Sequence, residues 1–461
     1  MSSFAPSPST EDAGAVESAR WLAPAGLTAA ILLGLALQDS NGFLTPIALR
    51  LAVIGFVLVV LATVTPRPVR FARLDAGLVP LLGTAGLALH LIQLYAAFPG
   101  IYLQLEPGGL APFHWGLAIL AAVGGSLMWD SPRWARLLQI GVLVATHAAL
   151  GIWVLQRSPD PTIDVHMFHR YAIAAFRQGV DPYAITFPDI YNNAANYGDG
   201  VLLNGRLQFG FPYFPLSLLL SMPAQLLTKD PRYSQLVAIE LAALLMAFAR
   251  RGGVGVVAAV LYLTTPRIFF VLEQSWTEPF LVLGVAAVVF AACRQSRLVP
   301  WLFGAFVALK QYLVFALPAA VLLASKSFDR REAAIFLTKG ALLGAIVTLP
   351  FVLWDPEAFW RSVVTLQIRQ PFRPDALSVL SWWAGQGHEQ PSSLIAFIVA
   401  GIASAVGLWR LPHTPAGFAT AIGLTFFAFF LFNKQAFCNY YFFVVGTLYV
   451  SVAAWHPQAI E

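Results

Sequence analysis

Acidic and histidine side chains gather in residues 156–213, a stretch with more polar chemistry than any other part of the chain. Asp164, His166 and His169 could form a metal ligand set, because carboxylates and imidazoles at short helical spacing bind divalent ions. No further histidine lies nearby and the spacing fits no fixed ligand pattern, so a solvated helix face is the better interpretation of both histidines. Asp160 suits a second acid of the same site or the start of a turn before proline, and we favour the turn.

An amphipathic helix over residues 165–178 is the element that must position Asp164. Its apolar face repeats every three or four residues, as one face of a helix does. This face contains Phe168, Tyr171, Ala172, Ala175 and Phe176. Asp164 directly precedes the helix and also suits its N-cap, where one carboxylate oxygen accepts hydrogen bonds while the other stays free. A capping role and a role in the site are therefore compatible.

Turns and aromatic residues fill the rest of this stretch. Tyr183 ends a Gly-Val-Asp-Pro-Tyr turn, and Tyr213 lies in the aromatic and proline-rich run 209–215. Residues 189–197 are rich in Tyr and Asn. They could stack against a sugar and bind its hydroxyl groups, or they could form an ordinary polar loop.

The order of these features resembles the GT-C glycosyltransferases. An acidic residue follows a membrane helix, and an amphipathic helix, a Gly-x-Asp-Pro-Tyr turn and an aromatic-proline segment come after it. The arrangement is most similar to the bacterial polyprenyl-phosphate-sugar-dependent mannosyl- and arabinosyltransferases of glycosyltransferase family 87. The specific match covers residues 164–215, and weaker matches lie at residues 276–279, 308–311 and 434–437.

The resemblance implies a chemistry for the site. Asp164 would be the general base that takes the proton from an acceptor hydroxyl as this attacks the anomeric carbon of a sugar. The turn that ends in Tyr183 would lie beside that sugar. The donor would be a polyprenyl-phosphate-linked sugar, and the acceptor a glycan, a lipid or a protein.

The composition indicates an all-α, polytopic membrane protein. Of the 461 residues, 58% are hydrophobic and 11% are charged, which is less than half the usual charged fraction. Apolar runs along residues 21–461 predict about 14 transmembrane helices in a single membrane domain. The resemblance implies that the fold of this domain is GT-C-like. Residues 1–20 are polar and lack the basic n-region of a signal peptide, which predicts a disordered cytoplasmic tail. The net charge of +5 does not argue for nucleic acid, because Arg and Lys fall mostly in short loops.

The positions of these basic loops predict the orientation. Arginines crowd two short loops, residues 67–73 and 133–136, so the positive-inside rule places the N-terminus in the cytoplasm. Residues 156–212 are then the main extracytoplasmic loop, with its amphipathic helix, and residues 355–390 are the second. One later segment must fail to span for the later charges to lie inside, and we take this to be residues 213–227, as a re-entrant or partly spanning helix. The resemblance makes this membrane the bacterial plasma membrane.

Two of the polar patches that reach the same face as Asp164 lie at helix ends. Glu278 starts an apolar helix, where the helix dipole favours an acid and where a carboxylate also suits sugar hydroxyl groups. Lys310 is a lone cation beside Gln311 at the outer end of an apolar segment. Snorkelling is the only structural alternative for Lys310, and we favour a functional role.

Two more patches lie in and after the second outer loop. Arg369 belongs to a mixture of basic and aromatic residues in the loop 355–390. This mixture suits an anionic lipid headgroup, or an amphipathic helix lying in the membrane interface. Lys434 and Tyr440 lie in the last patch, which could also be an ordinary helix boundary.

We therefore expect a membrane glycosyltransferase with a lipid-linked donor and an extracytoplasmic site. Asp164 is its expected base. The expected substrate-binding residues are Asp160, His166, Tyr183, Tyr213, Glu278, Lys310, Gln311, Arg369, Lys434 and Tyr440. No cofactor is expected, although a divalent metal stays open.

Two alternatives remain open. An ion-coupled transporter would be supported by charges buried in the middle of spans, whereas the strong charges lie at helix ends and in outer loops. A ligase, polymerase or flippase for lipid-linked oligosaccharides would share the basic outer loop without needing the Asp164 segment.

Overall fold

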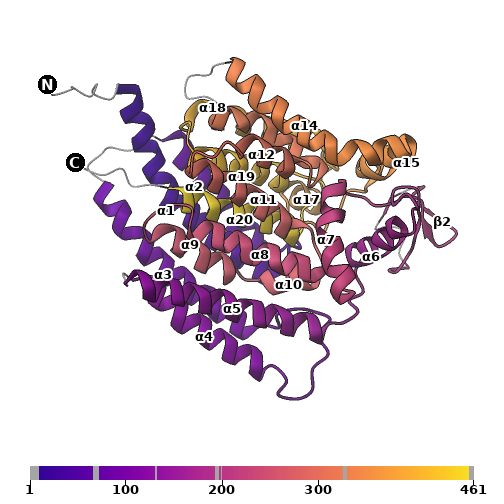
Figure 1. Ribbon diagram of the computed structural model, residues 1–461, viewed down its shortest axis with the longest axis horizontal. Coiled ribbons are helices and arrows are strands. Elements are labelled where there is room, and N and C mark those ends of the chain that lie inside the picture. Colours follow the sequence, from indigo (N-terminus) through magenta and orange to yellow (C-terminus); the bar gives the residue numbers. More distant parts are fainter. Residues whose placement is uncertain are drawn as a thin grey trace.

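The chain folds almost entirely into helices, as a computed structural model that describes residues 10–65, 72–129, 132–192, 197–198, 200–324 and 330–455 shows (Figure 1). Within these ranges, five helices are long and apolar enough to cross a membrane. They are α1 (Thr10–Ser40), α2 (Pro46–Val64), α3 (Ala72–Ala96), α5 (Arg133–Arg157) and α14 (Arg330–Trp354). The all-α class and the membrane character agree with the sequence. The number of about 14 transmembrane helices is not confirmed.

The remaining helices of the described ranges are shorter. They are α4 (Ala111–Leu127), α6 (Asp164–Arg177), α7 (Pro215–Thr228), α8 (Arg232–Ala247), α9 (Val254–Leu263), α10 (Ile268–Glu273), α11 (Glu278–Cys293), α12 (Val299–Val307), α13 (Val321–Ala324), α15 (Pro356–Trp360), α16 (Leu366–Arg369), α17 (Val379–Gly385), α18 (Leu394–Arg410), α19 (Pro415–Leu431) and α20 (Cys438–Ala454). A 3₁₀ helix covers Gln311–Ala320, and a π-helical turn covers Arg361–Thr365.

Several predicted spans are broken or short. The run 253–272 divides into α9 and α10 around Pro266, whose ring cannot donate a hydrogen bond, and Arg267 turns the chain with a φ of +69°. The run 312–324 is mostly 3₁₀ helix. α7 has 14 residues and contains Pro223, so its length is below the roughly 20 residues of a full span. α1 begins at Thr10, inside the range for which we predicted a disordered tail, and residues 1–9 lie outside the described part.

The centre of the molecule is built from helices that are apolar on all sides. α19 and α20 are buried along almost their whole lengths and pack against α11. A helix without a polar face must be enclosed by other helices, and Figure 1 shows α3, α4 and α5 on one side of this centre and α14 on the other.

The loop between α5 and α7 forms a second, smaller core. The expected amphipathic helix is present as α6, with Phe168 and Ala172 buried and Tyr171 exposed. Beside it lies a three-stranded antiparallel sheet in the order β1, β3, β2, a small exception to the all-helical expectation. The strands are β1 (Phe187–Pro188), β2 (Leu202–Leu203) and β3 (Arg206–Leu207). Figure 1 shows α6, α7 and β2 together at one end of the molecule.

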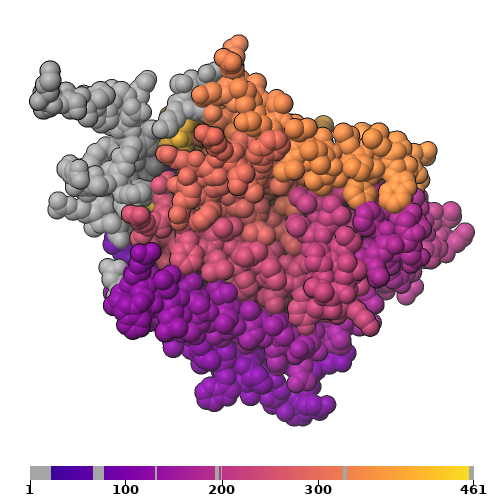
Figure 2. Space-filling view, in the orientation of Figure 1, coloured from indigo at the N-terminus to yellow at the C-terminus, as the bar shows by residue number. Residues whose placement is uncertain are grey.

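Ser362 joins this loop to the second predicted loop. Its hydroxyl accepts a hydrogen bond from Gly210 N–H at 2.8 Å and donates one to the Tyr183 carbonyl at 3.1 Å. A Cβ on Gly210 would lie 2.2 Å from that carbonyl oxygen, so the close approach requires glycine. In Figure 2 the residues of α14 and α15, coloured orange, meet the magenta loop residues at the surface.

Arginine side chains tie helix ends together far from this loop. Arg250 donates to the Ala454 carbonyl at 2.7 Å, and Arg294 donates to the Phe248 carbonyl at 2.7 Å. Arg250 follows the C-terminal end of α8, and Arg294 follows the C-terminal end of α11. The N-terminal ends of both helices lie toward the α6 region. Arg250 and Arg294 therefore lie beyond the ends of α8 and α11 that are away from α6.

The seam between α12 and α14 depends on two glycines. A Cβ on Gly304 would lie 2.1 Å from the Gly340 carbonyl oxygen, a distance that no relaxed contact allows. Small residues at such a seam let the backbones of membrane helices approach closely.

We expect Gly304→Ala to lower the midpoint of thermal unfolding of the purified protein, because the new methyl group collides with backbone and no rotamer can relieve it. Gly401→Ala is the matched control, since a Cβ there meets nothing within 4 Å on an exposed face of α18. That control should be neutral or gain up to about 1 kcal/mol from helix propensity. Equal midpoints for the two variants would show that the seam is not rigid.

Candidate active site

A cavity of about 170 Å³ lies where four separate parts of the chain meet. These parts are the loop between α5 and α7, the start of the 3₁₀ helix, residues 366–373 and the start of α20. The sequence-predicted residues that line it are Asp164, Tyr213, Lys310, Gln311 and Tyr440. The fold thus brings together side chains that are distant in the sequence.

Asp164 lies on one wall of the cavity as the first residue of α6. The N-cap is Ile163, so the predicted capping role is wrong: the Asp164 carboxylate accepts from the adjacent Val165 N–H at 2.7 Å. The Asp164 N–H donates to the Tyr191 hydroxyl at 3.0 Å, which fixes the start of the helix.

The surroundings of this carboxylate change its acidity. Burial raises the pKa of Asp164 to about 6, although hydrogen bonds and the positive charge of Arg373 act in the opposite direction. A general base is most effective when its pKa lies near the working pH. Asp164 is therefore mostly ionised at pH 7 and still basic enough to accept a proton.

Lys310 forms a buried ion pair at the wall of the same cavity. Its Nζ atom lies 2.6 Å from Glu278 Oε1 and donates to Thr277 Oγ1 at 3.2 Å. Lys310 is 4% exposed and Glu278 is 0% exposed, so the snorkelling alternative for Lys310 is wrong. Asn439 Nδ2 donates to the same Glu278 oxygen at 3.0 Å. Glu278 thus holds the ammonium group and does not itself line the cavity.

Three tyrosine rings enclose the Lys310 ammonium group. The distances from Nζ to the ring centroids are 4.8 Å for Tyr213, 5.3 Å for Tyr312 and 5.6 Å for Tyr440. A cation at such distances is attracted by the ring faces, and more strongly where water is excluded. An ammonium group has three donors, and Glu278 and Thr277 take two. One donor is left for a ligand in the cavity.

Arg373 lines the cavity, whereas the predicted Arg369 does not. Arg373 lies 4.8 Å from the Phe437 ring and forms a two-point ion pair with Asp375 at 2.9 and 2.7 Å. Arg369, the last residue of α16, is exposed. Both arginines lie in the loop identified from the sequence, but only the backbone path decides which one faces inward.

Lys434 supports the wall of the cavity from behind. Its Nζ donates to the Gln370 carbonyl at 2.6 Å and to the Ile368 carbonyl at 3.3 Å. Gln370 itself lines the cavity, as do Gln367 and Gln435. Lys434 therefore holds the loop and does not reach the cavity.

The two histidines of α6 are buried, so the solvated helix face predicted for them is wrong. His169 Nδ1 lies 2.8 Å from the Val165 carbonyl oxygen, and its ring packs against Tyr213 at 6.1 Å. Burial lowers the pKa of His166 to about 3 and that of His169 to about 4, which leaves both neutral at pH 7. Neither lines the cavity. Within the described ranges, no group of three or more His, Cys, Asp or Glu side chains is arranged to hold a metal ion.

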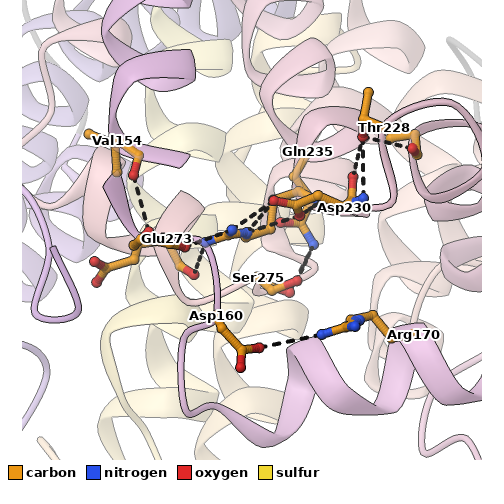
Figure 3. Close-up of polar contacts among 11 residues, drawn as sticks. Val154, Asp160, Arg170, Thr228, Asp230, Gln235, Glu273 and Ser275 are labelled. Atoms are coloured by element: carbon orange, nitrogen blue, oxygen red, sulfur yellow. Dashed lines mark hydrogen bonds and ion pairs between the residues drawn. The ribbon is translucent and has the colours of Figure 1, made fainter. Parts of the chain in front are cut away.

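Two other predicted residues lie outside the cavity. The Asp160 side chain is exposed and forms a long ion pair with Arg170 at 3.4 Å (Figure 3), in keeping with the turn interpretation. Tyr183 is fully buried, and its hydroxyl donates to the Tyr213 carbonyl at 2.8 Å. Tyr183 therefore fixes the backbone of Tyr213.

Unpaired polar atoms mark possible contacts for a ligand. Gln311 Nε2 donates to the Pro212 carbonyl at 3.2 Å, while its buried Oε1 has no partner among the described residues. The buried hydroxyl of Tyr197 also has none there, and both residues line the cavity. The Tyr- and Asn-rich composition of residues 189–197 was the only sequence signal for Tyr197.

A buried acid–base pair elsewhere escaped the sequence analysis. His147 Nδ1 in α5 lies 2.6 Å from Glu240 Oε1 in α8, and the imidazole stacks on Phe269 at 4.8 Å. Both residues lie in the middle of their helices, although we expected the strong charges only at helix ends and in loops. Their separation of 93 positions hides the pairing from any local pattern.

Comparison of the chain with protein-family models, curated proteins and solved structures finds no match.

We expect Lys310→Met to lower the free energy of unfolding by about 3–5 kcal/mol, because it leaves the Glu278 carboxylate buried without its partner. Adding Glu278→Gln should recover most of this loss, since it removes the uncompensated charge. Unfolding of the purified variants in detergent measures both effects. A double variant as unstable as the sum of the single variants would contradict the ion pair.

Proposed function

We propose that this protein is a GT-C-like membrane glycosyltransferase. It transfers a sugar from a polyprenyl-phosphate-linked donor to a glycan, lipid or protein acceptor on the extracytoplasmic face of the membrane. The observation that carries the proposal is that one cavity is lined by a carboxylate of near-neutral pKa, Asp164, and by two cations, Lys310 and Arg373. General-base chemistry and recognition of a phosphate need these two kinds of group.

The proposed reaction uses each group once. The acceptor hydroxyl gives its proton to Asp164 while its oxygen forms a bond to the anomeric carbon. The bond from that carbon to the phosphate oxygen breaks, and the electron pair leaves with the polyprenyl phosphate. Lys310 and Arg373 donate hydrogen bonds to the departing phosphate, and such charge-assisted bonds are stronger than neutral ones. Direct displacement of this kind inverts the anomeric centre.

A second cavity supports a lipid-linked donor. It has a volume of about 490 Å³ and is lined almost entirely by apolar residues of α12 and α14. Phe214 and Ala308 belong to the wall of this second cavity. Phe214 directly follows Tyr213 in the chain, and Ala308 lies two residues before Lys310; both Tyr213 and Lys310 line the first cavity. A ligand with a charged head and a hydrocarbon chain matches the two cavities better than a free sugar does.

The outer location of the cavity rests on charge placement. The basic residues Arg250 and Arg294 contact backbone carbonyls at the far ends of the helices. If this end faces the cytoplasm, as the positive-inside rule requires, the cavity faces outward. Nucleotide sugars are not supplied there, which favours a lipid-linked donor.

One observation favours the alternative of an ion-coupled transporter. The His147–Glu240 pair is a buried acid–base pair in the middle of α5, which is long and apolar enough to span a membrane, and of α8, and such groups often carry protons. Neither residue lines either of the two cavities described above. The glycosyltransferase accounts for more of the observed polar groups.

We expect Asp164→Asn to reduce transfer by about 10²–10⁴-fold, because the amide keeps the shape of the side chain and cannot accept the proton. Asp160→Asn is the matched control, since its exposed carboxylate lies outside the cavity, and it should retain most activity. Sugar transfer in vesicles at matched protein amounts decides this. Near-normal turnover by Asp164→Asn would remove the base assignment.

The same assignment predicts the pH profile of the reaction. The base acts only when ionised, so the rate should rise with pH through about 6 and then level off. The rate falls at low pH because the Asp164 carboxylate is then protonated and cannot accept a second proton. The profile can be measured as initial rate against pH, and a rate independent of pH between 5 and 8 would exclude Asp164 as the base.

For the donor, we expect Arg373→Gln to weaken binding of a polyprenyl phosphate by about 1.5–3 kcal/mol, the usual range for a hydrogen bond to a charged group. Arg369→Gln removes the same charge from the same loop outside the cavity and should change binding little. Titration of each variant with a short-chain polyprenyl phosphate in detergent gives the comparison. Equal losses would point to a general charge effect at the surface.

A further inference from the structure

Arg232, the first residue of α8, is 0% exposed and does not line the cavity. Its guanidinium group binds the Asp230 carboxylate through Nε at 2.9 Å and Nη2 at 2.7 Å. It also donates to the Ser158 carbonyl at 2.8 Å and to the Glu273 carbonyl at 3.4 Å. Burying a guanidinium group is costly unless its donors are satisfied, and here three separate partners satisfy it.

The contact with Ser158 reaches the chain segment that leads to Asp164. α5 ends at Arg157, and residues 158–163 connect it to Asp164. A second anchor holds this segment near its other end, where the Tyr102 hydroxyl donates to the Thr162 carbonyl at 2.7 Å. The position of Asp164 thus depends on anchors at both ends of a short connection.

Glu273 connects the two anchors. Its carboxylate accepts from the Ile101 N–H at 2.7 Å and from the Tyr102 N–H at 2.9 Å, while its carbonyl binds Arg232. A Cβ on Gly100 would lie 2.3 Å from Glu273 Oε1, so the loop can approach this carboxylate only with glycine there. Figure 3 shows Asp230 and Glu273 in one polar cluster, with Gln235 and Ser275 beside it.

The same cluster holds the segment that leads to the ion pair of the cavity. Glu273 ends α10, and Gln235 Nε2 donates to the Ser275 carbonyl at 2.8 Å, where the chain turns with a φ of +57°. Thr277 and Glu278 follow directly, and both bind Lys310. One buried side chain, Arg232, therefore contacts the segment that leads to Asp164 and the segment that leads to the Lys310–Glu278 pair.

We infer that Arg232 and Tyr102 are positioning residues, which set the separation between Asp164 and the Lys310–Glu278 pair through Ser158, Thr162 and Glu273. The expected effect of these residues on the rate of sugar transfer rests on the proposed function. Transfer needs the acceptor hydroxyl at hydrogen-bonding distance from Asp164 while the phosphate is held by Lys310. A displacement of about 1 Å in such an arrangement can cost 10²-fold in rate.

Tyr102→Phe tests this inference with the smallest change. It removes only the hydroxyl that binds the Thr162 carbonyl and keeps the ring. The turnover number kcat should fall about 10–100-fold while the KM for the donor stays within about twofold, because the donor contacts are untouched. Tyr95→Phe is the matched control, since Tyr95 is an exposed residue of α3 whose ring packs against His114 and not against this cluster. An unchanged kcat for Tyr102→Phe, or a raised KM alone, would overturn the inference.

Arg232→Lys tests the central residue. A single ammonium group cannot reach Asp230, Ser158 and Glu273 together, so its loss in kcat should exceed that of Tyr102→Phe. If Arg232→Lys does not fold, Tyr102→Phe decides alone. A folded Arg232→Lys variant with wild-type kcat would remove Arg232 from the positioning residues.

A third measurement does not depend on enzymatic activity. In an Asp164→Cys background, the rate at which a small water-soluble iodoacetamide alkylates residue 164 reports the position and exposure of that site, read by mass analysis of the peptide. Adding Tyr102→Phe should change this rate severalfold, and adding Tyr95→Phe should not. A changed alkylation rate together with no sugar transfer by the wild type would keep the positioning role and reject the proposed function. An unchanged alkylation rate would reject the positioning role, whatever the transfer assay shows.

Discussion

The structure around the cavity depends on the need to neutralise the buried charge of Lys310. A lone ammonium group in a low-dielectric region is costly, so it requires an anion and hydrogen-bond acceptors at short distance. Glu278 supplies the anion from the start of α11, Asn439 of α20 shares it, and tyrosine rings from three parts of the chain enclose the cation. Each contributing element is thereby fixed relative to the others.

The same requirement explains why the loop between α5 and α7 and the turn after α15 are ordered against the central helices. Tyr213 covers Lys310, Tyr183 binds the Tyr213 carbonyl, and Ser362 binds the Tyr183 carbonyl. This chain of contacts runs from the ion pair through the first loop to the π-helical turn of the second. Arg232 satisfies a second buried charge behind the loop and contacts the segments that lead to Asp164 and Glu278. Two satisfied charges thus define the geometry of one cavity.

The sequence identified the segments of this site better than the individual side chains. Asp164, Tyr213, Lys310, Gln311 and Tyr440 line the cavity, as their segments suggested. Arg369 was chosen in the right loop, but it is exposed, and Arg373 lines the cavity instead. The α6 histidines were expected in solvent, because an isolated helix pattern cannot show that a second core covers its polar positions. The His147–Glu240 pair was missed because its partners belong to different helices.

The sequence by itself determined the all-α, membrane-associated character of the protein, the amphipathic helix and the polar segments. These follow from local physics, since apolar runs must leave water and a periodic pattern of apolar residues selects a helix. The tertiary structure decided where the helices break, which arginine faces inward, and which buried charges are paired. Such decisions depend on desolvation and on partners that are distant in the chain. A buried charge is acceptable only when the whole fold supplies its partner, and no local pattern contains that information.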